Sequence, residues 1–193
     1  MSSIFYLLAG LALAHAWRGS HNSGPRKAVC VVQPDPQSTQ LVTGIVNFTQ
    51  SSYRSALKID VKLQGFSAVP ESAPESQFLH GFHIHEFGDL SGGCTSAGGH
   101  YNPFNVTHGD INDGVRHTGD LGNIRQRPDG TIPQLRIKDR RASLYGEFSI
   151  LGRAVVVHAK ADDLGRGGNP ASLLNGNAGS RLACCVIGLA NPV

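Results

Sequence analysis

The residues best suited to chemistry are histidines, and they cluster in the middle of the chain. The chain contains nine histidines, of which six fall between His80 and His117. Two of them, His83 and His85, stand in an apolar segment. Successive side chains of a strand point to opposite faces, so these two imidazoles share one face. They could form half of a metal site, although a strand with two surface histidines would have the same pattern.

A long loop after this segment supplies more metal-binding side chains. It holds His100, His108, His117 and Asp120, and three imidazoles with one carboxylate make a complete tetrahedral set for Zn²⁺. A glycine-rich loop collects one or two histidines by chance, but chance poorly explains four such residues within 21 positions. His158 ends an apolar segment and could add a ligand, although a histidine there is usually structural. Many imidazoles favour copper over Mg²⁺ or Ca²⁺, so we expect one or two transition metals.

The elements that must position these residues are short strands joined by turns. In residues 57–65, four aliphatic side chains alternate with polar ones, which is typical of a strand with one buried face. Comparable β-rich segments occupy residues 28–33, 43–50, 79–86, 119–127, 134–139, 149–158 and 183–190. No segment shows a sustained helical period. The pattern predicts an all-β barrel or sandwich of about eight strands. Two long polar loops, 88–119 and 159–180, are long enough to suggest function.

The N-terminal residues have the features of a leader. Residues 4–14 are a short apolar run, and Ala14-His15-Ala16 matches a signal-peptidase site. The run is too short to span a bilayer comfortably, although an uncleaved anchor is an alternative because no basic residue precedes it. We therefore expect a signal peptide at 1–16, a mobile tail at 17–27 and one domain at 28–193, with secretion and no stable membrane anchor.

Two further features agree with secretion. Asn47 and Asn105 each begin an N-glycosylation sequon, which is a weak signal by itself. The chain has four cysteines, an even number that can pair in an oxidising compartment. The net charge of +3 is too small to indicate a nucleic-acid partner, and no nucleic-acid-binding motif is present.

Five motifs are highly specific when taken together. They are Gly81-Phe-His-Ile-His-Glu-Phe-Gly-Asp89, Gly99-His-Tyr-Asn-Pro103, Arg116-His-Thr-Gly-Asp-Leu-Gly-Asn123, Val156-Val-His-Ala-Lys-Ala-Asp-Asp-Leu-Gly165 and Gly176-Asn-Ala-Gly-Ser-Arg-Leu-Ala-Cys184. With them, residues 27–191 resemble the copper/zinc superoxide dismutase family, its secreted branch in particular. The resemblance implies an eight-stranded Greek-key barrel or sandwich and a homodimer. It also implies conversion of superoxide to O₂ and H₂O₂ by Cu(II)/Cu(I) cycling beside zinc, as antioxidant defence outside the cell.

The resemblance also implies a role for each clustered residue. The copper ligands would be His83, His85, His100 and His158, and the zinc ligands His100, His108, His117 and Asp120. His100 would then bridge both metals through its two ring nitrogens and supply a proton. Asp162 would link the outer nitrogens of His83 and His108, and Arg181 would attract and orient superoxide.

The resemblance further implies a disulfide between Cys94 and Cys184. Cys185 should not compete for Cys94, because adjacent side chains of a strand point to opposite faces. The first and last strands of a closed barrel are neighbours, so Cys30 could pair with Cys185. Two buried free thiols are the alternative.

The second long loop departs from the family pattern. Pro170, Ala171 and Leu174 stand where many relatives carry acidic residues and a lysine, which weakens the expectation of electrostatic guidance. Lys160 and Arg166 could replace part of that charge.

Two other functions would also use clustered histidines. A zinc hydrolase or lyase would need only three of them, and a metal-binding protein without catalysis would not need Arg181. All seven ligand positions and Arg181 are present, which favours the dismutase.

Overall fold

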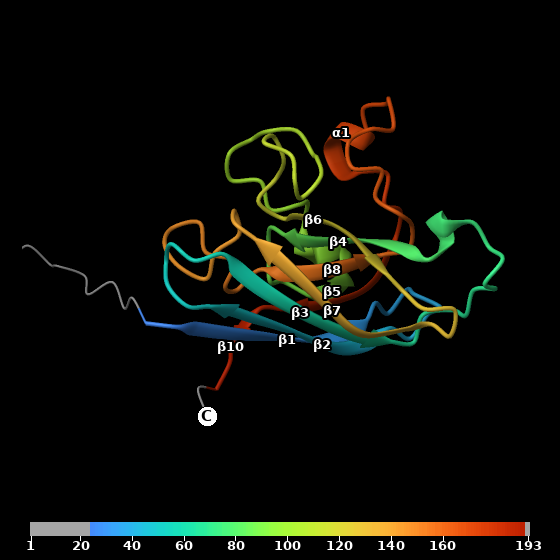
Figure 1. The fold of residues 1–193 in the computed structure, drawn as a ribbon, viewed down its shortest axis with the longest axis horizontal. Coiled ribbons are helices and arrows are strands. Elements are labelled where there is room, and N and C mark those ends of the chain that lie inside the picture. Colours follow the sequence, from blue (N-terminus) through green and yellow to red (C-terminus); the bar gives the residue numbers. More distant parts are fainter. Residues whose placement is uncertain (1–23, 192–193) are drawn as a thin grey trace, which may run out of the picture.

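Eight strands surround a large apolar core in the computed structural model of this protein, which describes residues 24–191 (Figure 1). In sheet order they are β6 (Asp120–Arg125), β4 (Leu79–His85), β8 (Ala154–His158), β9 (Arg181–Val186), β1 (Arg26–Pro34), β2 (Thr43–Gln50), β3 (Leu57–Gln64) and β7 (Thr131–Asp139). Neighbouring strands pair antiparallel, and a short β10 (Gly188–Leu189) also pairs with β1. This nearly closed antiparallel barrel confirms the all-β prediction.

The strands form because apolar residues alternate along them. In β3, Leu57, Ile59, Val61 and Leu63 are buried, whereas Lys58 and the other intervening residues lie at the surface. The connections from β3 to β4 and from β7 to β8 each pass over intervening strands, as a Greek-key order requires. The barrel is therefore a rigid wall from which β4 and β8 present their histidines.

Several boundaries differ from the expected ones. Strand β1 begins at Arg26, inside the segment assigned to the tail. Residues 149–153 do not belong to β8, which begins at Ala154. The last strand is interrupted at Ile187, whose backbone exchanges hydrogen bonds with Gly152 and Arg153 and not with the sheet. These breaks depend on contacts between distant segments, which local periodicity does not reveal.

The two long loops contain short elements that the sequence did not indicate. The first holds β5 (Ser91–Cys94) and a 3₁₀ turn (Thr95–Ala97), and the second holds the one-turn helix α1 (Ser172–Asn175). Another 3₁₀ turn (Glu75–Gln77) precedes β4. The loops meet over one side of the barrel (Figure 1), where the backbone N–H of His108 donates to the backbone carbonyl of Leu173 at 2.9 Å. They therefore cover the face of β4 that carries the histidines.

Two disulfides hold the last strand. Cys94–Cys184 joins β5 in the first long loop to β9, and Cys30–Cys185 joins β1 to β9. Cys185 packs in the main core, whereas Cys184 packs in a separate cluster with Cys94, so the adjacent cysteines do face opposite ways.

Replacing Cys30 and Cys185 together by serine is expected to lower the free energy of unfolding by roughly 4 kcal/mol in the chain-entropy model. Cys30 and Cys185 are 155 residues apart in the sequence. The Cys94–Cys184 disulfide stays intact in the variant, so the loop that the Cys30–Cys185 bond closes runs through that disulfide and contains only about 65 residues. Urea unfolding of the variant and the parent measures the difference. Thiol titration of denatured, unreduced parent should find no free thiol, and two free thiols per chain would contradict the pairing.

Candidate metal centre

Strand pairing brings the predicted ligands to one side of β4. His83 lies opposite Asp120 of β6 and Val156 of β8, and His85 forms an isolated bridge with His100. His158 stands at the end of β8, beside the same face. His83 and His85 are fully buried. These imidazoles therefore point into an enclosed site.

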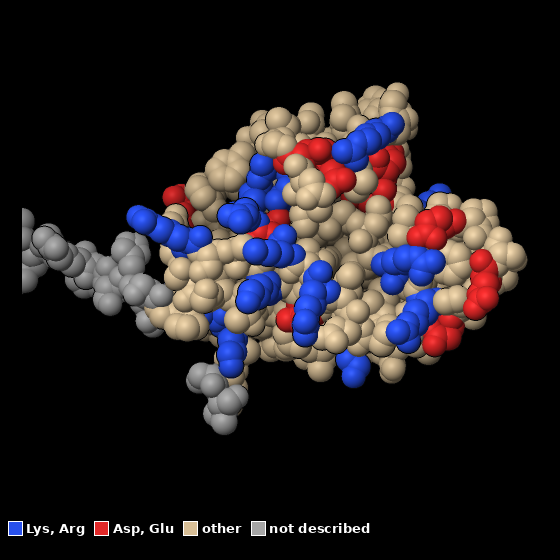
Figure 2. All heavy atoms as spheres, viewed as in Figure 1, with Lys and Arg blue, Asp and Glu red and all other residues tan. Residues whose placement is uncertain are grey.

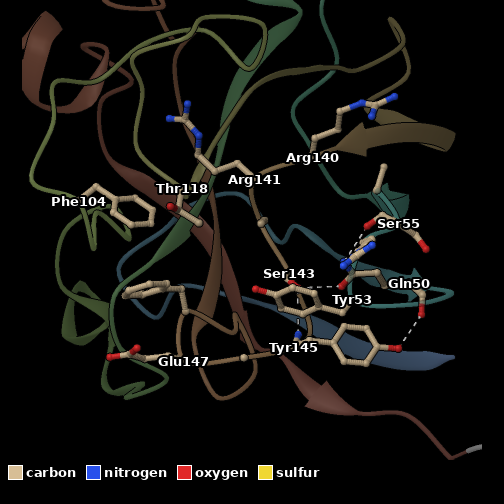
Figure 3. Close-up of a pocket in the computed structure, with 15 residues that line it drawn as sticks. Gln50, Tyr53, Ser55, Phe104, Thr118, Arg140, Arg141, Ser143, Tyr145 and Glu147 are labelled. Carbon is tan, nitrogen blue, oxygen red and sulfur yellow. Dashed lines mark hydrogen bonds between the residues drawn. The ribbon is translucent and has the colours of Figure 1, made fainter. Parts of the chain in front are cut away.

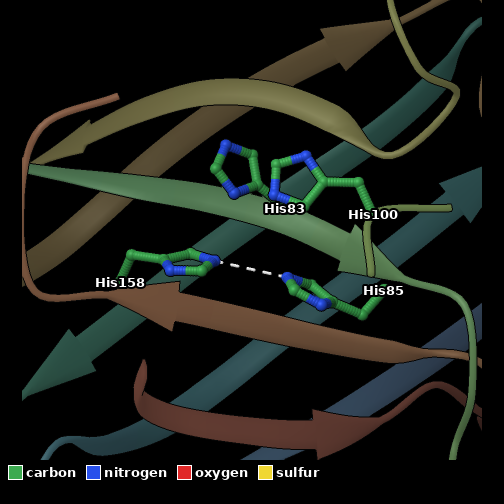
Figure 4. Close-up of side chains that lie close together, drawn as sticks. All are labelled: His83, His85, His100 and His158. Atoms are coloured by element: carbon green, nitrogen blue, oxygen red, sulfur yellow. Dashed lines mark hydrogen bonds between the residues drawn. The ribbon is translucent and has the colours of Figure 1, made fainter. Parts of the chain in front are cut away.

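The first group of donors consists of four histidines, which we call the four-histidine set. Its members are His83, His85, His100 and His158, and one ring nitrogen from each lies within 4.8 Å of the others (Figure 4). The Nε2 atoms of His85 and His158 are 3.3 Å apart. His83 Nδ1 and His100 Nε2 are buried without a hydrogen-bond partner. A buried polar atom without a partner is unfavourable, so these unpaired nitrogens fit a bound metal ion.

Backbone carbonyls occupy the outer nitrogens of two of these rings. His85 Nδ1–H donates to the Gly98 carbonyl at 2.9 Å, and His158 Nδ1–H donates to the Gly179 carbonyl at 3.2 Å. Each bond leaves Nε2 without a proton and directed inward. Such outer partners set the tautomer and orientation of metal-binding histidines. The sequence carried no signal for these carbonyls, because any residue supplies one.

The second group, the histidine–aspartate set, consists of His100, His108, His117 and Asp120. The Nδ1 atoms of the three histidines lie 2.9, 2.9 and 3.1 Å from Asp120 Oδ1. At least one of these short approaches is not a hydrogen bond, since buried His108 Nδ1 has no acceptable partner. Three imidazoles around one carboxylate oxygen fit a tetrahedral Zn²⁺ site. His100 belongs to both sets, with Nδ1 in this set and Nε2 in the other.

Asp162 connects the two sets. Its two carboxylate oxygens accept hydrogen bonds from His83 Nε2–H and His108 Nε2–H, each at 2.8 Å. The three side chains also satisfy the spacing of a metal site, but these direct hydrogen bonds leave no space for an ion. Asn123 holds the Asp162 backbone through both of its amide atoms. Asp162 thus leaves Nδ1 of both histidines free to bind metal.

The environment makes the four-histidine set neutral. Burial, followed by the repulsion that a protonated His100 would exert, lowers the pKa of His158 to about 3. Burial likewise holds the pKa of His83 and His85 well below the ordinary histidine value. Neutral imidazoles bind metal without first losing a proton, so this set is ready for a cation at pH 7.

The histidine–aspartate set has the opposite electrostatics. Burial alone would lower the pKa of His108, but its close contacts with the Asp120 and Asp162 carboxylates outweigh burial and raise this pKa to about 9. Burial would raise the pKa of Asp120, yet its contacts with His100, His108 and His117 hold it well below the ordinary value. This set therefore attracts a positive charge, which a metal ion would provide in place of the proton.

Arg181 stands at the mouth of the four-histidine set. Its guanidinium donates to the carbonyls of Gly98 at 2.6 Å and Thr95 at 3.3 Å, and also to that of Cys94. With His85, His100, His158 and other residues it lines a pocket of about 300 Å³. Leu174, which is 67% exposed, and Asn175 also line this pocket, so the departure in the second long loop lies directly beside the metal centre.

The chain is similar to proteins of known family. A family model described as copper/zinc superoxide dismutase matches residues 42–187. "Superoxide dismutase [Cu-Zn] 4" of Dictyostelium discoideum is 45% identical over 83% of this chain and 97% of its own length. "Superoxide dismutase [Cu-Zn]" of Pleurocordyceps sinensis is 48% identical over 86% of this chain and 99% of its own length. "Extracellular superoxide dismutase [Cu-Zn]" of Onchocerca volvulus is 46% identical over 89% and 80%, respectively.

Proposed function

We propose, from the premise that this chain belongs to the copper/zinc superoxide dismutase family and is a superoxide dismutase, that the four-histidine set binds copper and the histidine–aspartate set binds zinc. The observation that carries this assignment is the convergence of seven donors into two sets that share His100. Imidazole-rich donors suit copper, and three imidazoles with a carboxylate suit zinc. A hydrolase or lyase that bound a single zinc ion through His83, His85 and one further histidine would leave most of the histidine–aspartate set without a role.

The reaction converts two superoxide ions and two protons into O₂ and H₂O₂. When bound, copper supplies the one-electron oxidation and reduction, and zinc supplies charge without redox chemistry. Of the chain's own groups, we assign proton transfer to His100 Nε2, because this atom faces the four-histidine set without a protein partner. Burial lowers the pKa of His100, which favours release of that proton to the reduced substrate.

The assay that tests this function follows superoxide decay before and after copper removal. Protein treated with a copper chelator should lose its catalysis, and copper added alone should restore it. Zinc added alone should not restore it, because zinc has no redox chemistry. Decay that continued at the original rate after complete copper removal would contradict the proposal.

Arg181 is proposed to bind and orient superoxide. The three backbone carbonyls around its guanidinium hold a permanent positive charge at the pocket that contains His85 and His158. Leu174 contributes no charge at this pocket. Arg181 would therefore carry a large share of the attraction that the anion experiences close to the metal.

Replacing Arg181 by methionine is expected to lower kcat/KM by about 10- to 100-fold, the range for losing a hydrogen bond to a charged group. Copper and zinc contents should not change, and Arg181→Lys should recover part of the loss. The surface variant Arg136→Met removes the same charge from the outer wall and should keep full activity. Loss of metal from Arg181→Met, or unchanged kinetics, would contradict a role in substrate binding.

A homodimer is proposed from the family and from an exposed apolar patch. Phe87 and Val186 are 52% and 40% exposed. A side chain added at Gly88 would meet the Gly152 carbonyl and Val186, so the first long loop and β9 adjoin in this patch. Covering such a surface is favourable. Sedimentation of the parent protein should show a dimer, and sedimentation of the Phe87→Glu variant should show a monomer. A monomeric parent would contradict the proposal.

Secretion is proposed from the leader at 1–16, which lies outside the described residues. Relatives from Onchocerca volvulus, rat and human carry names that call them extracellular. Asn47 on β2 and Asn105 in the first long loop are both exposed and available to a glycan. Among residues 24–191, no helix is long and apolar enough to cross a membrane. Protein from a secretory host should appear in the medium beginning at Trp17, and retention in the cell would contradict secretion.

A further inference from the structure

A second pocket, of about 410 Å³, shares no lining residue with the pocket at the metal centre. It lies between the turn that follows β2, the first long loop, and residues 140–148 (Figure 3). Its volume is in the range of small-molecule sites. We propose that this pocket binds a small planar aromatic anion, such as an aromatic carboxylate.

Aromatic rings stand at both ends of the pocket. The rings of Phe104 and Phe148 are 5.0 Å apart, and those of Tyr53 and Tyr145 meet edge to face at 6.4 Å. Tyr53, Phe104 and Phe148 are 66%, 54% and 43% exposed although they surround one depression. Rings in this arrangement offer faces and edges to a planar aromatic ligand, and covering them removes apolar surface from water.

Thr118 adds a polar group that has no partner. Its side chain lies between that of Phe104 and those of Tyr53 and Tyr145 in Figure 3. The residue is 1% exposed, and its buried Oγ1 has no hydrogen-bond partner in the structure. Leaving a buried hydroxyl unpaired is unfavourable, and an acceptor atom on a ligand would relieve that penalty. Thr118 is therefore the group that we expect to receive a ligand oxygen.

The other polar groups of the pocket wall are already engaged. Gln50 donates to the Ser55 carbonyl at 2.8 Å and accepts from the Leu144 N–H at 2.7 Å. The Ser143 hydroxyl donates to the Gln50 side chain at 3.2 Å. These bonds make a preformed wall, which favours binding because little has to be ordered.

The charge at the rim selects an anion. Arg54 and Arg140 line the pocket, are exposed, and make no ion pair within residues 24–191. Arg141 also lines it and donates to the Gly114 carbonyl at 2.8 Å, while Glu147 is the one acidic lining residue. Guanidinium groups favour a carboxylate. Residues 17–23 contain Arg18 and no acidic residue. This segment therefore lacks the negative charge that the arginines of the rim would attract.

The test is a fluorescence titration of the full-length metal-loaded protein with naphthalene-2-carboxylate. The neutral alcohol of the same ring system should bind about tenfold more weakly than the carboxylate, because the charge-assisted contacts are lost. The corresponding ammonium compound should bind more weakly still. Equal affinity for all three compounds would show that the pocket binds aromatic rings without selecting an anion, and it would overturn the proposal.

Variants locate the binding. Arg54→Gln with Arg140→Gln should weaken the carboxylate about tenfold, and Thr118→Val should weaken it by several-fold. Lys58→Gln, a change of exposed charge on β3 outside the pocket, is the matched control and should have no effect. Arg181→Gln should leave the affinity unchanged. Loss of binding in Arg181→Gln alone would place the anion at the metal centre and overturn the assignment to this pocket.

Discussion

His100→Ala is expected to reduce superoxide dismutation to below about 1% of the parent rate and to weaken the binding of both metals. The ring places Nε2 in the four-histidine set and Nδ1 in the histidine–aspartate set, where it lies 2.9 Å from Asp120 Oδ1. No other side chain contributes to both sets. Loss of a direct ligand should exceed the 10- to 100-fold loss of metal affinity that is typical when an outer partner is removed. The same substitution also removes the proposed proton donor.

The measurement combines metal analysis with superoxide-decay kinetics. The control is His80→Gln, because His80 is a buried imidazole of β4 that bonds Gln126 and the His158 carbonyl without joining either donor set. That variant should keep both metals. If His100→Ala bound copper and zinc as tightly as the parent, the ring would not be shared and the proposed arrangement would be wrong.

Asp162→Asn is expected to weaken binding of copper, zinc or both by about 10- to 100-fold. In the parent, both carboxylate oxygens accept an N–H, one from His83 and one from His108. An amide has one oxygen and one NH₂ group, so it can accept only one of these two protons. The other imidazole must then turn its unprotonated Nε2 toward the amide, which moves its proton to Nδ1. That atom is the one through which the ring would bind metal.

Competition titrations with a chelator for each metal measure the effect. Asp60→Asn, the same chemical change at a surface ion pair with Arg136, is the matched control and should bind both metals as the parent does. Asp162→Glu should not restore the parent, because a longer side chain displaces both oxygens within a buried site. Unaltered affinity for both metals in Asp162→Asn would show that the hydrogen bonds of Asp162 do not set the tautomers.

The barrel was predictable because its signal is local. Alternation of buried and exposed residues, as in Leu57–Gln64, reflects the two faces of one strand and needs no knowledge of its neighbours. The strand boundaries at Ala154 and Val186 were not predicted, because they depend on contacts between segments that are distant in the sequence. There the chain leaves the sheet because Ile187 pairs with Gly152 and Arg153, residues more than thirty positions away.

The candidate metal centre was likewise predictable only in part. The identity of the seven donor residues follows from side-chain type and motif, whereas the ring nitrogen that each histidine presents does not. The carbonyls of Gly98 and Gly179 select Nε2 of His85 and His158, and Asp162 selects Nδ1 of His83 and His108. The unpaired hydroxyl of Thr118 is equally invisible in the sequence, since a threonine beside a predicted ligand histidine gives no sign of lacking a partner.

The sequence by itself determined a β-barrel with imidazole and carboxylate donors, because alternation and side-chain chemistry belong to each residue, and its five motifs carried the resemblance to the dismutase family. Only the tertiary structure decided which nitrogens converge, that Cys30 and Cys185 form a disulfide and are not two free thiols, and where a second pocket opens. Those outcomes depend on backbone groups and walls contributed by segments far apart along the chain, such as β1 and β9, which meet only when the barrel closes.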